Sequence, residues 1–258
     1  MKIMIITQNA PLYLPLFMDD FLNLISNTKH KIKGVVVLSS LFKKSFLKEV
    51  YDRYKFYGLI DFFKMSFLIA KWKMFSLFPM KKIFSLKKAI SKYNLKEYKV
   101  DSINSDQFIN LIKKENIDLV ISVASSQILK KELIKAPKKG CINYHTSLLP
   151  EYRGRMPLFW ALKNKEKEIG ISVHEVDEEI DNGPIIVQKR ILTEGRESLH
   201  KLYLKTIEIG PEVLLEAVNK IDQGIEERIL NDKNNATYFG FPDCEDVKEF
   251  KLKGNKFF

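Results

Sequence analysis

Residues 118–145 read DLVISVASSQILKKELIKAPKKGCINYH, and two apolar runs in this stretch predict the fold. The first run covers residues 118–125 and the second covers residues 140–145. Neither run alternates apolar with polar residues throughout, which is typical of strands that are buried on both faces. We therefore predict two strands of a sheet that is covered on both sides.

Strand and helix patterns also alternate over the N-terminal part of the chain. The apolar spacing predicts, in order, a strand at 2–7, a helix at 11–26, a strand at 30–40, a strand at 98–104 and a helix capped by Ser or Asp at 105–117. Such alternation predicts an α/β fold, a mostly parallel sheet with helices on both faces. Ligands of these sheets bind beyond the carboxyl ends of the strands.

The region after residue 145 predicts a pair of extended stretches and a long helix. The extended stretches lie in 168–191 and are joined by an acidic turn at 177–183, and the helix covers 197–224 with an interruption expected at Gly210-Pro211. We expect one domain over 1–224 and a short C-terminal tail over 225–258.

The 258-residue chain has a formal net charge of +11, and its basic excess lies in one segment. Residues 41–100 hold 15 Lys or Arg against 4 Asp or Glu, so the rest of the chain is neutral. Within this segment, residues 41–93 predict a helical basic insert, interrupted near Pro79, with large apolar residues on one side and Lys on the other.

The N-terminus and the cysteines restrict the class of protein. The first apolar run is too short for a signal peptide or a membrane span, so we expect a cytoplasmic protein. Cys141 and Cys244 lie far apart without paired spacing, which favours two reduced thiols over a disulfide or a metal site. We therefore expect no metal.

Asn143 and His145 lie two residues apart at the end of the second apolar run. On an extended chain both side chains point to the same face, because side chains alternate with a period of two. Taken alone, the pair is more typical of a turn cap and a strand-end histidine than of a functional site. The residues that follow it reverse this interpretation.

A loop rich in Pro and Gly follows the pair, and an aspartate in a short motif comes later. The two motifs read Asn143-Tyr144-His145-Thr146-Ser147-Leu148-Leu149-Pro150-Glu151-Tyr152-Arg153-Gly154 and Asp181-Asn182-Gly183-Pro184. Together with QILKKELI at 127–134, they resemble the formyltransferases that use 10-formyltetrahydrofolate, and most of all the nucleotide-sugar N-formyltransferases. The resemblance covers roughly residues 118–192 and implies a Rossmann-like formyltransferase fold.

The chemistry of formyl transfer explains these residue types. A formyl carbon attacked by an amine becomes tetrahedral and places negative charge on its oxygen, so the site needs hydrogen-bond donors aimed there. The predicted donors are the amide of Asn143 and the imidazole of His145. Asp181 would receive a proton from the amine, directly or through water, and would hold His145 protonated and oriented. His174 is interpreted as a structural or pocket-lining histidine.

The resemblance also implies a pocket for 10-formyltetrahydrofolate that is built partly from backbone. By position, Ile128 and Leu129 would line the pteridine site, and the turn from Val176 through Asp177 to Asp181 would close over it. Core packing is an equal alternative for Ile128 and Leu129.

Four residues of the loop are candidates for binding the substrate, namely Ser147, Tyr152, Arg153 and Gly154. Ser147 and Arg153 could equally shape the loop, and Arg153 could contact an anionic part of a substrate. The resemblance therefore leaves their roles open.

The resemblance includes enzymes that act on methionyl-tRNA, on glycinamide ribonucleotide and on nucleotide-linked amino sugars, and hydrolases that pass the formyl group to water. The tRNA enzymes carry a further C-terminal barrel for which too few residues follow Asp181, and the hydrolases carry an extra N-terminal domain. Glycinamide ribonucleotide enzymes are not expected to contain the insert. We therefore expect a nucleotide-linked amino sugar as the substrate, as in lipopolysaccharide biosynthesis, and no nucleic acid partner. The non-enzymatic alternative is a polyanion-binding protein with a degenerate site.

The basic insert over 41–93 has three interpretations. It could be a helical pair packed on the core with solvated lysines, a lid that aims Lys or Arg at a diphosphate, or a peripheral membrane contact. Packing on the core is favoured, and it predicts that Trp72, Phe75 and Phe78 are at least partly buried against the protein. A homodimer is left open.

Overall fold

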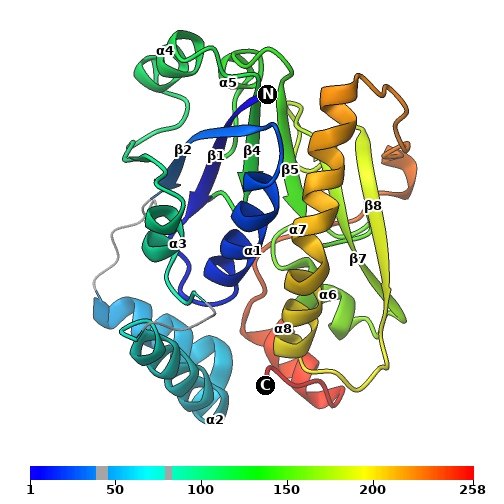
Figure 1. Cartoon of the computed structure of the whole chain (residues 1–258). Coiled ribbons are helices and arrows are strands. Elements are labelled where there is room, and N and C mark those ends of the chain that lie inside the picture. The colour runs from blue at the N-terminus through cyan, green and yellow to red at the C-terminus, as the bar shows by residue number, and fades with distance from the viewer. Residues whose placement is uncertain (39–45, 79–82) are drawn as a thin grey trace.

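In the computed structural model, which describes residues 1–38, 46–78 and 83–258, a sheet of seven strands forms the centre of the molecule (Figure 1). The strand order is β3-β2-β1-β4-β5-β7-β8. Strands β1 to β5 pair in parallel, whereas β7 is antiparallel to β5 and β8 is antiparallel to β7. The predicted mostly parallel α/β sheet is confirmed.

The elements of the first half of the chain follow the predicted alternation. They are β1 (Lys2–Gln8), α1 (Leu14–Ser26), β2 (Lys31–Leu38), α2 (Phe46–Phe75), α3 (Leu86–Lys92), β3 (Glu97–Tyr98), α4 (Asp106–Lys114), β4 (Leu119–Val123), α5 (Lys131–Ile134) and β5 (Cys141–His145). The Ser105 side chain accepts a hydrogen bond from the Phe108 backbone, so the predicted cap of α4 is confirmed.

The second half adds the antiparallel pair, the long helix and the tail. Its elements are β6 (Arg153–Gly154), α6 (Pro157–Lys163), β7 (Glu168–Glu175), β8 (Ile185–Leu192), α7 (Leu199–Gln223), a 3-10 turn (Lys233–Asn235), β9 (Tyr238–Phe239) and α8 (Cys244–Leu252). The extended pair joined by an acidic turn is therefore confirmed.

Two local predictions are wrong. The strand predicted at 98–104 is reduced to β3, because the chain leaves the sheet and the Ile103 backbone N–H bonds to the Gln127 side chain instead of a strand. Helix α7 is continuous through Gly210-Pro211. Pro211 leaves the Ile207 carbonyl without its helical donor, and the Tyr144 hydroxyl donates to the neighbouring Thr206 carbonyl.

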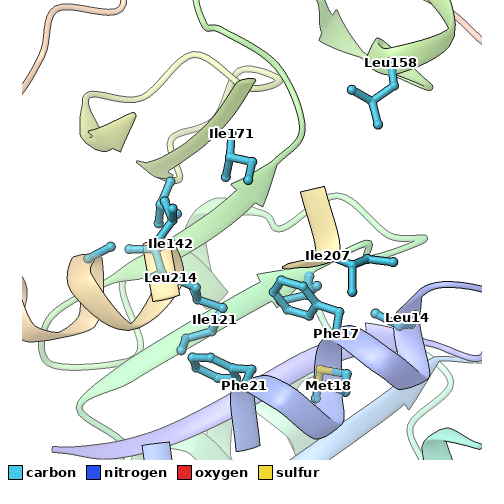
Figure 2. Close-up of a cluster of buried hydrophobic side chains, with 14 of the residues drawn as sticks. Leu14, Phe17, Met18, Phe21, Ile121, Ile142, Leu158, Ile171, Ile207 and Leu214 are labelled. Carbon is cyan, nitrogen blue, oxygen red and sulfur yellow. The ribbon is translucent and has the colours of Figure 1, made fainter. Parts of the chain in front are cut away.

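The sheet has a hydrophobic layer on each face, since residues of its central strands alternate between the two. Ile3 and Ile5 of β1 face the layer under α1 and α7, and Met4 and Ile6 face the layer under α4 and α5. Figure 2 shows side chains of α1 and α7 meeting those of β4, β5 and β7 in the larger layer. This rigid sheet carries the site at the end of β5.

The C-terminal segment is part of the same packed body. Strand β9 pairs with β6 in the loop that follows β5, and Phe250 and Phe257 are completely or almost completely buried. Phe250 stacks on Phe159 of α6 with ring centroids 4.6 Å apart. The segment expected as a tail thus helps to build the core next to the site.

The helical insert is confirmed as α2 and α3, while Pro79 lies outside the described residues. Its predicted division into an apolar side and a Lys side is wrong, because Met65 is buried on one face of α2 while Phe67 is exposed on another. Gly58 has a non-helical backbone conformation, so α2 consists of two helices joined at a kink. Trp72 is 8% exposed and Phe75 is half-buried, as predicted. The prediction is wrong for Phe78, which is 58% exposed because the outward side of this helix has no protein over it in the described residues.

Candidate active site

The antiparallel pairing of β5 with β7 brings three side chains of the site together. Asn143 lies opposite His174 and His145 lies opposite Ser172 in the register. Opposed residues on neighbouring strands direct their side chains to the same face. The loop between β7 and β8 then returns the chain over this face and places Asp181 on it.

The Asp181 carboxylate is the centre of the cluster. Its Oδ1 atom lies 3.2 Å from the Asn143 amide nitrogen and 3.5 Å from His174 Nε2. Its Oδ2 atom accepts a hydrogen bond of 2.8 Å from the Gly154 backbone N–H and lies 3.6 Å from His145 Nδ1. The three residues predicted as catalytic are therefore within reach of one another.

The carboxyl group of Asp181 is only 11% exposed. Burial acts to raise its pKa, but the neighbouring His145 and His174 and the Gly154 N–H act more strongly, and its pKa lies well below the ordinary value. Asp181 is therefore a carboxylate at neutral pH, with its negative charge fixed between two imidazoles.

The hydrogen bonds of the cluster show which donors are in use. His145 Nε2 lies 2.9 Å from the Tyr152 carbonyl oxygen, so this nitrogen carries a hydrogen. The Asn143 amide nitrogen contacts both Asp181 and, at 3.3 Å, His174 Nε2. The predicted donors thus point at protein acceptors, and the contact from Asn143 to His174 is the longer of its two.

A second layer of polar groups holds the Asp181 loop. Arg153 is buried and donates to the Asn182 and Asn231 side-chain oxygens at 2.9 Å and 2.8 Å. Asn231 in turn donates to the backbone carbonyls of Asp181 and Gly183 at 3.0 Å and 2.9 Å. These bonds join the loop after β5, the loop after β7 and the C-terminal segment.

Two glycines allow the backbones to approach this closely. Gly154 has a positive φ of 96°, and a Cβ atom there would lie 2.2 Å from the Phe239 carbonyl oxygen. A Cβ atom at Gly183 would lie 2.0 Å from the Glu175 carbonyl oxygen. Glycine at both positions therefore lets β9 and the Asp181 loop close on the site.

The residues predicted at the folate pocket divide into two groups. Leu129 is buried and Val176 packs on the same apolar cluster, whereas Ile128 is 62% exposed. The Asp177 side chain accepts from the Glu179 backbone and the Asn182 amide, so it closes the turn internally. Ile128 is therefore an exposed apolar side chain beside a buried one.

Most residues predicted to bind the substrate have protein partners. The Ser147 hydroxyl donates to the Glu151 carbonyl, and the Tyr152 hydroxyl donates to Glu166 while its ring stacks on Phe239. Burial raises the pKa of the Tyr152 phenol above its ordinary value. These contacts, like those of Arg153, favour a role in shaping the loop.

Sequence reasoning missed the contribution of His174 to the cluster and that of Asn231. The alternation of ISVHEV placed His174 on a strand, but only the register with β5 shows that it contacts Asn143 and Asp181. Nothing in the local sequence marks Asn231, because its contacts join segments far apart in the chain.

The described residues were also searched for cavities, for groups that could bind a metal and for helices that could cross a membrane. A cavity of about 630 Å³ is lined partly by the loop after β5, including Ser147 and Tyr152, and partly by β7 and β8, and the three predicted catalytic residues do not line it. Within the described ranges, no group of three or more His, Cys, Asp or Glu could hold a metal ion. No helix there is long and apolar enough to cross a membrane.

Comparison with known proteins identifies relatives of this chain. The sequence profile of the family described as formyl transferase matches residues 76–218, more than half of the chain. The methionyl-tRNA formyltransferase of Thermodesulfovibrio yellowstonii is 39% identical over 140 residues, which are 54% of this chain and 46% of that protein. That of Kosmotoga olearia is 35% identical over 153 residues, 59% and 49% of the two chains. The alignments span about half the length of these curated relatives.

Solved structures share the fold at low sequence identity. The phosphoribosylglycinamide formyltransferase of Anaplasma phagocytophilum has a TM-score of 0.62 and 15% identity, covering 94% of this chain and 99% of that one. A 4-N formyltransferase of Francisella tularensis has a TM-score of 0.60 and 22% identity, covering 93% and 76%. An N-formyltransferase of Helicobacter canadensis, in complex with folinic acid and dTDP-3-aminofucose, has a TM-score of 0.59 and 17% identity, covering 96% and 79%.

Proposed function

Because the chain belongs to the formyl transferase family, we propose that it transfers a formyl group from 10-formyltetrahydrofolate to the primary amine of a nucleotide-linked amino sugar. The observation that carries this proposal is the buried Asp181 carboxylate, held among Asn143, His145 and His174 at the end of β5. Formyl transfer needs a fixed negative charge beside hydrogen-bond donors, and this cluster supplies both.

His145 and Asn143 are the donors for the oxygen of the tetrahedral intermediate. His145 Nε2 is occupied by the Tyr152 carbonyl, whereas Nδ1 lies 3.6 Å from Asp181, longer than a hydrogen bond, so the donor left for the substrate oxygen is an N–H at Nδ1. The 3.3 Å contact from Asn143 to His174 is long, and a substrate oxygen can replace His174 as acceptor. Each donor of this kind typically lowers the barrier by about 3 kcal/mol.

The protons that move in the reaction indicate that Asp181 acts mainly through its negative charge. The attacking amine loses one proton when the new C–N bond forms, and N10 of the folate gains one when its bond to the formyl carbon breaks. A carboxylate of lowered pKa is a weak base, so the amine proton passes through a water beside Asp181 rather than resting on it. The charge of Asp181 meanwhile faces His145 Nδ1 at 3.6 Å.

The formyl donor fits the surface next to this cluster. Ile128 is exposed beside the buried Leu129, and Val176 begins the turn that leads to Asp181. An apolar side chain next to a turn rich in backbone polar groups suits a planar ring with a polar edge. We assign Ile128, Leu129 and the turn 176–181 to the folate side of the site.

A second acceptor, methionyl-tRNA, has its own support. The sequence relatives quoted above are methionyl-tRNA formyltransferases, with up to 39% identity to this chain. The N-formyltransferase solved with dTDP-3-aminofucose resembles it in fold, at 17% identity. The acceptor is tested by incubating the protein and 10-formyltetrahydrofolate with dTDP-, UDP- and GDP-linked amino sugars, and separately with charged initiator tRNA. Formylation of a sugar but not of the tRNA supports the proposal, and the reverse result contradicts it.

The catalytic assignment is tested by Asp181→Asn and His145→Ala. We expect each to lower turnover at least a hundredfold, since each removes a charge or donor that acts in the transition state. Tetrahydrofolate formation reports turnover, and thermal unfolding checks that each variant is folded. Asp232→Asn, at the half-buried cap of the 3-10 turn in the C-terminal segment, is the matched control. Turnover within tenfold of the parent for Asp181→Asn or His145→Ala would contradict the catalytic role of that residue.

A further inference from the structure

Helix α2 carries large apolar side chains on its outward face. They form a stripe, here called the outer stripe, of Ile60, Phe63, Phe67, Ala70, Met74 and Leu77, with the large members 52% to 79% exposed. The spacing of three and four residues places all six on one side of the helix and of the turn that follows it. A surface helix normally shows polar side chains on this face.

The opposite face of the helix is already used for packing. Met65 and Trp72 are buried, and the Trp72 ring lies edge-on to Tyr13 with centroids 6.2 Å apart. Asp61 forms an ion pair of 3.3 Å with Lys251 of α8. Because the helix is anchored through this inner face, the outer stripe is not needed to hold it to the protein.

Charge on the edges of the outer stripe indicates what covers it. Lys64 and Lys71 lie along one edge and Lys73 along the other, all exposed. Asp61 is the only acidic residue in the sequence from 59 to 78, and it already pairs with Lys251 at 3.3 Å and with Lys64 at 3.7 Å. A second copy of the chain would bring the same lysines without carboxylates to pair them, which disfavours self-association through this face.

We propose that the outer stripe docks on an anionic lipid bilayer, with α2 lying in the interface. Apolar side chains on one helix face enter the boundary of the acyl chains, and lysines at its edges reach the phosphate groups with their long stems. The stripe stands out from a single helix and is not a groove, which suits a deformable lipid surface better than a folded protein. Figure 1 shows α2 past the carboxyl ends of β1 and β2, at one end of the molecule.

The proposal rests on α2 alone and is independent of the proposed formyl transfer. It is tested by flotation with vesicles of phosphatidylcholine and with vesicles of equimolar phosphatidylcholine and phosphatidylglycerol. We expect the protein to float with the anionic vesicles only. Phe63→Ser combined with Phe67→Ser should lower binding at least tenfold, because it removes two of the largest stripe residues.

Matched variants separate the outer stripe from general surface effects. Leu230→Ser with Leu252→Ser, both about as exposed as Phe67, should leave binding unchanged. Lys71→Gln with Lys73→Gln should weaken anionic binding about tenfold, whereas Lys113→Gln with Lys114→Gln on α4 should not. Circular dichroism confirms that each variant is folded.

Three results would overturn the proposal. The first is a protein that fails to float with anionic vesicles. The second is stripe variants that bind as well as their controls. The third is a protein that does not bind vesicles but instead forms a dimer, which Phe63→Ser with Phe67→Ser converts to a monomer. Binding to polyglutamate that the same double variant abolishes, again without vesicle binding, would count equally. These last outcomes would identify a second copy or an acidic polypeptide as the partner.

Discussion

The end of β5 and the outward face of α2 depart from ordinary burial in opposite directions. At the end of β5, two histidines and an aspartate are almost fully buried, and each has polar partners. On the outer stripe of α2 and the turn after it, Phe67 and Leu77 are exposed to 72% and 79%. Buried polar groups and exposed apolar patches are the informative exceptions to the general rule. We interpret each exception as a surface or site with a task beyond folding, as proposed above.

Buried and exposed phenylalanines should differ strongly in their contribution to the free energy of unfolding. Phe250→Ala should cost about 3–5 kcal/mol, since Phe250 is completely buried against Phe159 and Phe257. Phe67→Ala should change the free energy of unfolding by about 0.5 kcal/mol or less. Urea denaturation measures both. A cost above about 1 kcal/mol for Phe67→Ala would show that the outer stripe packs on the protein.

A buried charge outside the site provides a second comparison. Glu197 is 5% exposed and accepts hydrogen bonds from the Glu194 backbone and, at 2.6 Å, from Lys205. Burial acts to raise its pKa, but these partners lower it from 4.5 to about 2. Its contribution is therefore fully present above pH 4.5 and is lost as the pH falls towards 2.

Glu197→Gln should accordingly lower the free energy of unfolding at pH 7 by roughly 2 kcal/mol and leave formyl transfer unchanged. Urea denaturation at pH 7 and pH 3 checks the direction, because the difference from the parent should shrink at pH 3. An equal difference at both values would contradict the role of the Glu197 charge.

A variant of Asn231 tests whether the polar groups that hold the Asp181 loop affect turnover by positioning its carboxylate. Asn231→Ala removes the bonds to the Asp181 and Gly183 carbonyls, and a small shift of the carboxylate should lower kcat about tenfold with little change in KM for the folate. Asn235→Ala, in the exposed turn nearby, is the control. A raised KM with unchanged kcat would show that Asn231 serves binding instead.

The smallest expected effect concerns the two thiols. Cys141 lies in β5, where burial raises the pKa of its thiol to about 12, while Cys244 is exposed. Iodoacetamide should therefore alkylate only Cys244 in the folded protein, with no loss of activity. Mass spectrometry identifies the modified residue. Labelling of Cys141 at a similar rate would show that β5 opens readily.

The local pattern of residues was sufficient to predict the buried strands and the side chains that meet at the end of β5. Apolar runs of strand length are buried whatever their partners are, so β1, β2, β4 and β5 followed from their own residues. The period of two placed Asn143 and His145 on one face, and the resemblance of the later motif supplied Asp181. These features are encoded by residues that lie close together in the sequence.

Long-range packing decided the rest. His174 and Asn231 reach the Asp181 loop only through the register of β7 on β5 and the return of the C-terminal segment. On α2 both faces carry apolar residues, so periodicity cannot tell which one is buried. The contact of Trp72 with Tyr13 determines that the face with Met65 and Trp72 is buried. Phe67 then faces outward, because one straight helix cannot bury two opposite faces against a single surface.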